Sequence, residues 1–297
     1  MIYFIFFIIF LFSCFMKNIL NFRDIINLYD GFIFDQFGVI HNGLEINSEI
    51  EKSIIEIKNK KKKFYVLSNS GKTNFKNHTR ISKMGIKIIN SNDIITSGDI
   101  FKNLLINKKH PFDNLGKKFF IIGNNDDLLN DTQYIQCSNI FDSDFLLLIT
   151  IANNSNKDKI KFYLDKGLEN NKKLICVNPD KVGINGNSIS LSVGSIAEEY
   201  EKNGGSVIYV GKPYLNSFQY VLDLLQPLDN KKVLMIGDSL FTDIKGAYES
   251  GIDSLFICSG IHKHDFENLE YVNISKKIID ITKEKFMPNY FCKDFKY

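Results

Sequence analysis

The stretch Gly237-Asp238-Ser239-Leu240-Phe241-Thr242-Asp243, with its two aspartates, is the most informative feature of this chain. It follows the apolar run Val233-Leu234-Met235-Ile236, which is typical of a buried strand. A second buried run, Phe32-Ile33-Phe34-Asp35, also ends in a carboxylate. Parallel α/β sheets bring such strand ends to one crevice, and neighbouring buried carboxylates are costly unless a cation lies between them. The pattern therefore predicts a metal site at the edge of a parallel sheet.

Polar residues follow four strand-like runs in order along the chain, at Asp35, Ser68, Lys212 and Asp238. Together they supply what Mg²⁺-assisted phosphoryl transfer to a carboxylate requires. Asp35 is the predicted nucleophile, which would form an aspartyl-phosphate. Ser68 is predicted to bind phosphoryl oxygens, and Lys212 to bind the phosphoryl group and stabilise the charge of the transition state. Asp238, with Asp243 behind it, is predicted to hold Mg²⁺.

Simpler explanations stay open for the single residues. An Asp or a Ser after a strand is also a favoured helix N-cap, so Asp238 and Ser68 have a structural alternative. Lys212 has the alternative of a surface lysine beside a turn proline. A phosphorelay receiver also combines Asp, Ser or Thr, and Lys, but it places its acidic pair before the phosphoacceptor, whereas here the pair comes last.

Composition favours an ordinary soluble enzyme. The 297 residues carry 37 basic and 34 acidic side chains, a net charge of +3, so no nucleic-acid partner is predicted. The five cysteines are odd in number, widely spaced and without a C-x-x-C pair. Cys176 and Cys258 lie in apolar runs, which favours reduced, buried thiols and a cytoplasmic location.

Residues 1–16 form an apolar N-terminal extension without charge. They are fewer than the ~20 residues that a membrane-spanning helix needs. They also lack the basic segment that precedes the apolar core of a secretory signal. We expect a disposable extension; a membrane tether or an export signal stays open as the alternative.

From residue 31 the chain alternates strand-like and helix-like segments, the pattern of a parallel α/β sheet with crossover helices. Residues 17–100 and 206–297 are the predicted core, and 101–205 the predicted inserted α/β domain. Val207–Val210 is predicted as the third core strand. A helix is predicted to start at Ser48, with Glu51 completing a capping box.

Four sequence motifs resemble those of the haloacid dehalogenase-like (HAD) hydrolases. Two further stretches, Ile94–Gly98 and Asn178-Pro179-Asp180, narrow the resemblance to subclass IIA, the branch of p-nitrophenyl-phosphatase-like, phosphoglycolate and pyridoxal-phosphate phosphatases. The resemblance implies a Rossmann-like core, an inserted α/β cap of type 2 at 101–205, Mg²⁺ as cofactor and phosphoric monoester hydrolysis. The motifs are Asp35-Gln36-Phe37-Gly38-Val39, Leu67-Ser68-Asn69, Gly211-Lys212-Pro213 and Gly237-Asp238-Ser239-x-x-Thr242-Asp243.

One position departs from the family. The family has a second Asp two residues after the nucleophile, which protonates the leaving oxygen and later activates water, and this chain has Phe37 there. The resemblance implies that Asp35 and the backbone carbonyl of Phe37 still bind the metal. A lost acid–base group costs typically ~10²–10⁴-fold in rate. A subgroup with an aromatic residue at this position is similar in carrying Gly-Val and a His next, so His41 is the candidate substitute, with a structural flap histidine as the alternative.

The remaining expectations concern the substrate. Asn69 is expected to bind phosphate beside Ser68, and Asn178 and Asp180 to bind the substrate from the cap. His262 and His264 are expected to be solvent-exposed.

The predicted function is a Mg²⁺-dependent phosphatase acting on a small phosphorylated metabolite, with no nucleic-acid partner. A homodimer stays open, and membrane contact is expected only through residues 1–16.

Two other functions stay open. A catalytically weakened module could bind a phosphometabolite or a protein partner through the same cleft, since Phe37 removes the usual proton donor. A phosphotransferase would fit if poor activation of water favoured another acceptor.

Overall fold

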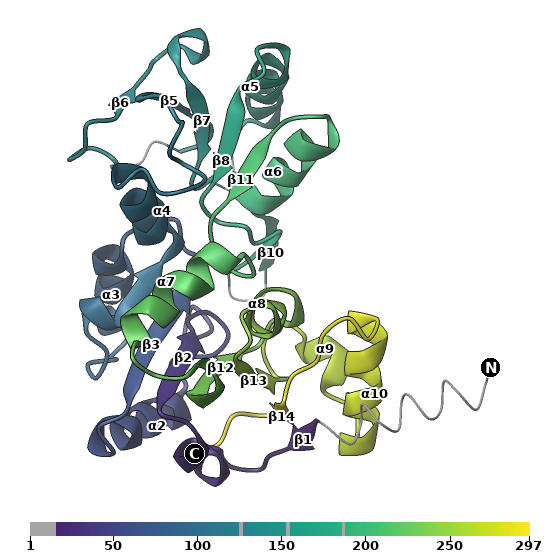
Figure 1. The fold of residues 1–297 in the computed structure, drawn as a ribbon. Helices are drawn as coiled ribbons and strands as arrows, with labels where there is room; N and C mark the ends of the chain where they lie inside the picture. The colour runs from purple at the N-terminus through teal and green to yellow at the C-terminus, as the bar shows by residue number, and fades with distance from the viewer. Residues whose placement is uncertain (1–15, 125–126, 153–154, 186–187) are drawn as a thin grey trace. The chain divides into compact units, whose positions relative to one another are not determined.

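The computed structural model describes residues 16–124, 127–152, 155–185 and 188–297 (Figure 1). The chain divides into two compact units. The first contains residues 16–67, Ile81–Asp93 and Phe218–Tyr297, and the second contains Ser68–Arg80 and Ile94–Ser217. Each unit is built on a parallel sheet with helices, so the predicted α/β fold class is confirmed.

The first unit contains six parallel strands in the order β1-β14-β13-β12-β2-β3. The register places Ile236 opposite Phe34 and Leu67 opposite Asp35, so β12, β2 and β3 run to the same edge of the sheet. All five residues of β2 and of β12 are buried, as expected for strands covered on both faces. The strands are β1 (Lys17–Asn18), β2 (Gly31–Asp35), β3 (Lys63–Ser68), β12 (Val233–Gly237), β13 (Asp253–Ile257) and β14 (Tyr290–Cys292).

One face of this sheet is covered by α10 (Tyr271–Thr282), whose Ile274 and Ile278 pack with Phe256 and Phe291. Met16 belongs to the same apolar cluster and β1 pairs with β14, so the chain is part of the fold from Met16 onward. The other fifteen residues of the predicted extension 1–16 lie outside the described residues. The other helices assigned wholly to this unit are α2 (Ser48–Asn59), α8 (Lys245–Glu249) and α9 (Lys263–Phe266).

The helix predicted to start at Ser48 is confirmed as α2, but its N-cap is Asn47, whose side chain accepts the Glu49 N–H. The predicted capping box of Ser48 and Glu51 was therefore wrong. A polar helix, α3 (Asn74–Lys83), follows β3. Among the described helices, none combines the length and the apolar character needed to cross a membrane.

The second unit contains a five-stranded parallel sheet in the order β11-β8-β7-β5-β6 and an antiparallel hairpin, β9–β10. Helices α5 and α6 pack on one face of the sheet, where Leu164 and Tyr200 meet Leu146 and Leu174. The strands of these two sheets are β5 (Lys118–Ile121), β6 (Ile135–Gln136), β7 (Phe145–Leu148), β8 (Lys173–Cys176), β9 (Val182–Asn185), β10 (Ser188–Leu191) and β11 (Val207–Tyr209). The residue range of this unit also includes the short strand β4 (Ile94–Thr96), which belongs to neither sheet. The helices are α4 (Ser97–Ile106), α5 (Lys157–Glu169) and α6 (Val193–Lys202), followed by α7 (Leu215–Leu225).

The strand before Lys212 was assigned to the wrong sheet. Val207–Val210 was predicted as the third core strand, but β11 pairs with β8, with Val207 opposite Leu174, inside the sheet of the second unit. The compact second unit accordingly takes in residues 206–217, along with 68–80 and 94–100, beyond the predicted range 101–205. A three-residue strand carries no local signal for which sheet it joins, because its partner lies far away in sequence.

Candidate active site

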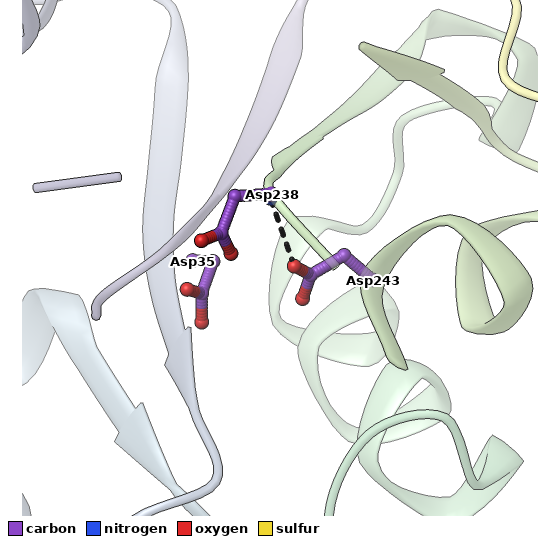
Figure 2. A group of neighbouring side chains, drawn as sticks. All are labelled: Asp35, Asp238 and Asp243. Atoms are coloured by element: carbon purple, nitrogen blue, oxygen red, sulfur yellow. Dashed lines mark hydrogen bonds between the residues drawn. The ribbon is translucent and has the colours of Figure 1, made fainter. Parts of the chain in front are cut away.

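The ends of β2 and β12 bring three carboxylates together. Asp35 is the last residue of β2, and Asp238 follows β12 directly. One oxygen from each of Asp35, Asp238 and Asp243 lies within 4.8 Å of the others, and the three residues are only 8%, 4% and 1% exposed. Figure 2 shows the three carboxyl groups gathered beside one another. Three buried carboxyl groups this close bring several oxygen atoms to one point of the fold.

Asp243 shapes the turn that carries Asp238. It lies in a π-helical turn, Leu240–Ile244, and its Oδ2 accepts the backbone N–H groups of Asp238 and Ser239, each at 3.1 Å. Turns of this kind are frequent at functional sites. Gly237 allows the carboxylate to approach, because a Cβ there would lie 2.2 Å from the Cβ of Asp243. Asp243 therefore holds the backbone of Asp238 and Ser239 in place, while the Asp238 side chain faces Asp35.

Two glycines enclose the Asp238 carboxylate. Its Oδ2 accepts the Ile261 N–H at 2.7 Å. A Cβ on Gly38, where φ is +96°, or on Gly260 would lie 2.0 Å from that same oxygen. Side chains at either position would displace the carboxylate. Gly260 and Ile261 were not singled out from the sequence, although the Ser259-Gly260 pair after a buried strand is the kind of signal that marks such a loop.

The donor set fits a hard divalent cation. All three side chains offer only oxygen, which Mg²⁺ and Ca²⁺ prefer. Backbone N–H groups orient Asp238 and Asp243, so their carboxylate oxygens are held in fixed positions beside Asp35. The acidic cluster predicted from Asp35, Asp238 and Asp243 is thus present, whereas the role of the Phe37 carbonyl as a ligand stays a prediction.

The flap after Asp35 is a tight loop built around His41. His41 is buried; its Nδ1 accepts the Gly43 N–H at 3.0 Å, and its Nε2 lies 3.3 Å from the Gln36 amide nitrogen. The Phe37 ring packs edge-on against the imidazole, with 5.4 Å between ring centroids. Both ring nitrogens of His41 therefore face groups of the flap itself.

The second unit holds three of the other predicted residues together. Asn69 donates through Nδ2 to Asp180 Oδ1 at 2.7 Å and to the Lys212 carbonyl at 3.0 Å. Its Oδ1 accepts the Lys212 N–H at 2.6 Å. Asn178 accepts the Asp180 N–H at 3.0 Å, which shapes the turn after β8. The predicted residues thus fall into a carboxylate group in one unit and an Asn69–Asp180–Lys212 group in the other.

Two of the open alternatives do not hold. Lys212 is only 2% exposed, so it is not a surface lysine. Ser68 is the last residue of β3, and α3 begins only at Asn74, so Ser68 does not cap that helix. Its hydroxyl accepts the Ser70 N–H at 3.3 Å.

His262 was expected to be solvent-exposed, and this was wrong, whereas His264 is exposed as expected. The His262 side chain is 15% exposed and that of His264 is 93% exposed. His262 Nε2 accepts the Leu240 N–H at 3.4 Å, at the start of the π-helical turn, and its Nδ1 lies 3.3 Å from Asp265. The cause is aromatic packing, because the rings of Phe241, Phe256 and Phe266 have centroids within 6.3 Å of the imidazole.

Comparison with known families places the carboxylate group in context. A family model described as haloacid dehalogenase-like hydrolase matches residues 32–134, which include Asp35 and Ser68. A second model, described as HAD-hydrolase-like, matches residues 209–294, which include Lys212 and Asp238. Together the two ranges span well over half of the chain. The chain belongs to the haloacid dehalogenase-like hydrolases.

Two curated HAD relatives are distant in sequence, and both are phosphatases. The chain is 26% identical over 121 residues to dihydroxyacetone phosphatase of Corynebacterium glutamicum, covering 38% of this chain and 44% of that protein. It is 28% identical over 97 residues to the ribonucleotide monophosphatase NagD of Escherichia coli K12, covering 32% and 37%. The match therefore spans less than half of each curated relative. NagD agrees with the predicted subclass IIA, while the subgroup with an aromatic residue at position 37 stays a prediction.

The fold of this HAD member is shared over nearly its whole length with solved structures. A possible sugar phosphatase of the HAD superfamily from Cytophaga hutchinsonii superposes with a TM-score of 0.77 at 21% identity. The match covers 94% of this chain and 98% of that one. At this identity the similarity supports the fold, a parallel-sheet core with a second α/β unit.

The buried imidazole gives a pH-dependence that can be measured. Burial lowers the pKa of His262, against the opposing effect of Asp265. As pH falls below the ordinary histidine value of about 6.5, the unfolded chain takes up the proton before the folded one. The free energy of unfolding should therefore fall between about pH 7 and about pH 5, and His262→Gln should lack this component.

Urea unfolding of wild type and His262→Gln across this pH range checks the prediction. His264→Gln, at the exposed neighbour, is the matched control and should follow the wild type. Parallel curves for wild type and His262→Gln would contradict a buried, neutral His262.

Proposed function

We propose that the protein is a Mg²⁺-dependent phosphatase that hydrolyses a small phosphorylated metabolite through an aspartyl-phosphate on Asp35. The observation that carries the proposal is the group of Asp35, Asp238 and Asp243, with oxygens within 4.8 Å at the ends of paired strands. The similarity to dihydroxyacetone phosphatase and to a ribonucleotide monophosphatase supports it, because both act on small phosphate esters.

The proposed chemistry has two steps. A carboxylate oxygen of Asp35 attacks phosphorus, and the bond from phosphorus to the leaving oxygen breaks with its electron pair on that oxygen, which then takes up a proton. Water attacks the phosphorus of the aspartyl-phosphate next, releasing inorganic phosphate and restoring Asp35. Asp35, Asp238 and the Phe37 carbonyl would hold Mg²⁺, supported by Asp243. When bound, the ion would supply positive charge against the anionic group and the phosphoryl oxygens.

The roles of the remaining residues stay predictions. Ser68 and Lys212 are the predicted ligands of phosphoryl oxygens, and Asn178 and Asp180 the predicted contacts to the rest of the substrate. The cytoplasmic location and a homodimer also stay predictions.

Phe37 favours a second candidate function. Without a carboxylic acid at this position, the protein could bind a phosphometabolite or a partner with little turnover, or pass the phosphoryl group to an acceptor other than water. His41, the candidate substitute, has its Nδ1 engaged by the Gly43 N–H and its Nε2 beside Gln36. Rate measurements on a His41 variant therefore decide whether His41 acts as the acid or base.

The covalent mechanism predicts the effect of Asp35→Asn. A neutral amide cannot attack phosphorus, so turnover should be lost with the fold intact. The measurement is phosphate release from a panel of phosphate esters with and without Mg²⁺, together with intact mass after rapid acid quenching, which should show a phosphate adduct in the wild type and none in Asp35→Asn. Asp30→Asn, at the opposite end of β2, is the matched control and should keep both signals. Mg²⁺-dependent release by Asp35→Asn would rule out the proposed nucleophile.

The absence of a carboxylic acid at position 37 predicts the choice of substrate. Leaving groups that depart as stable anions need no proton, so p-nitrophenyl and acetyl phosphate should be hydrolysed far faster than sugar phosphates. Phe37→Asp should raise the kcat for sugar phosphates by ~10-fold or more, within the range that acid–base groups contribute. Phe37→Leu, which also removes the aromatic ring but adds no acid, is the control and should not.

His41→Ala completes this experiment. If His41 supplies the proton, its removal should lower the rate for sugar phosphates more than the rate for p-nitrophenyl phosphate. Efficient sugar-phosphate hydrolysis that is insensitive to both His41→Ala and Phe37→Asp would show that the proton donor is elsewhere. Absence of turnover with every phosphate, combined with tight phosphate binding, would favour the binding module.

A further inference from the structure

Asn69 makes three hydrogen bonds through one buried amide. Asn69 is 5% exposed. Its Oδ1 accepts the Lys212 N–H at 2.6 Å, and its Nδ2 donates to the Lys212 carbonyl at 3.0 Å and to Asp180 Oδ1 at 2.7 Å. A side-chain amide nitrogen has two N–H donors. Both donors of Asn69 therefore point at protein acceptors, which differs from the arrangement expected of a phosphate ligand.

The segments that meet at Asn69 are closely packed. They leave neighbouring strands, since β8 and β11 are paired and the Val210 N–H donates to the Cys176 carbonyl at 2.9 Å. A Cβ on Gly211, where φ is +133°, would lie 2.5 Å from Pro179 Cδ and 2.8 Å from Asn69 Oδ1. The loop before Lys212 and the loop that carries Asp180 can thus approach one another only because position 211 has no side chain.

We propose that Asn69 is a positioning residue that couples Lys212 to Asp180. The inference rests on the proposed function, which gives Lys212 and Asp180 their roles toward the substrate. One amide fixes the Lys212 backbone through both its N–H and its carbonyl, and the same amide orients the Asp180 carboxylate. A hydrogen bond to an ionised acceptor is stronger than a neutral one, especially where water is excluded. A substitution at position 180 should therefore change the position of Lys212, because Asn69 is bonded to both residues.

Exchanging donor and acceptor tests this coupling. Asn69→Asp replaces the donor that faces Asp180 with a second carboxylate, so the two side chains repel each other. The kcat for p-nitrophenyl phosphate should fall by ~100-fold, the scale of a misplacement of about 1 Å, with a smaller change in KM. Adding Asp180→Asn places an amide donor opposite the new carboxylate, whose other oxygen can still accept the Lys212 N–H. The double variant should recover part of the lost kcat; the rest stays lost because the carboxylate introduced at position 69 still faces the Lys212 carbonyl, to which the Asn69 amide donates in the wild type.

A direct phosphate ligand predicts a different result. In that case Asn69→Asp brings negative charge against the phosphate, KM rises, and Asp180→Asn gives no recovery. Asn77→Asp is the matched control, because Asn77 is another buried amide of the same segment, bonded to Ser70, Lys72 and Thr73. Asp180→Asn should not rescue it. Rescue of Asn69→Asp alone supports the proposal; rescue of neither variant, or of both alike, overturns it.

Urea unfolding of the same variants separates this inference from the proposed function. Asn69→Asp should lower the unfolding midpoint, and the added Asp180→Asn should raise it again, whether or not the protein is an active phosphatase. A wild type without phosphatase activity would therefore contradict the proposed function while the midpoints still decide the coupling. Midpoint changes that simply add would overturn the proposal.

Discussion

The parallel pairing of β2 with β12 is the constraint on which the candidate site depends. Because Phe34 lies opposite Ile236, Asp35 and Asp238 leave the sheet at the same edge. Both strands are buried along their whole length, so the two carboxylates meet where the surroundings solvate charge poorly. Their proximity is costly unless positive charge is supplied, and this requirement connects the fold to metal-assisted chemistry.

Backbone groups of the chain fix the positions of these carboxylates. Asp243 accepts two backbone N–H groups of the π-helical turn, and Asp238 accepts the Ile261 N–H. Gly38 and Gly260 leave space for the Asp238 carboxylate, which any side chain would fill. These hydrogen bonds fix the direction in which each carboxylate oxygen points. Preorganisation of this kind lets a site bind an ion without first rearranging.

The features that sequence alone predicted are local ones. A buried apolar run that ends in Asp marks both β2 and β12, and the spacing of Asp238 and Asp243 within one turn identifies the acidic cluster. The features it missed depend on distant partners. The sheet to which β11 belongs is decided by β8, and the burial of His262 by Phe241 and Phe256 from separate segments. The contacts of Asn69 come from residues 111 and 143 positions away.

Calorimetric titration of the purified protein with Mg²⁺ measures directly whether the three carboxylates bind a cation. We expect saturable binding to the wild type, strong weakening in Asp238→Asn, and weakening in Asp243→Asn because the turn loses its support. Asp229→Asn, just before β12, should bind like the wild type. Binding that is unchanged in Asp238→Asn, or absent from the wild type, would contradict the claim that the three carboxylates form a cation site.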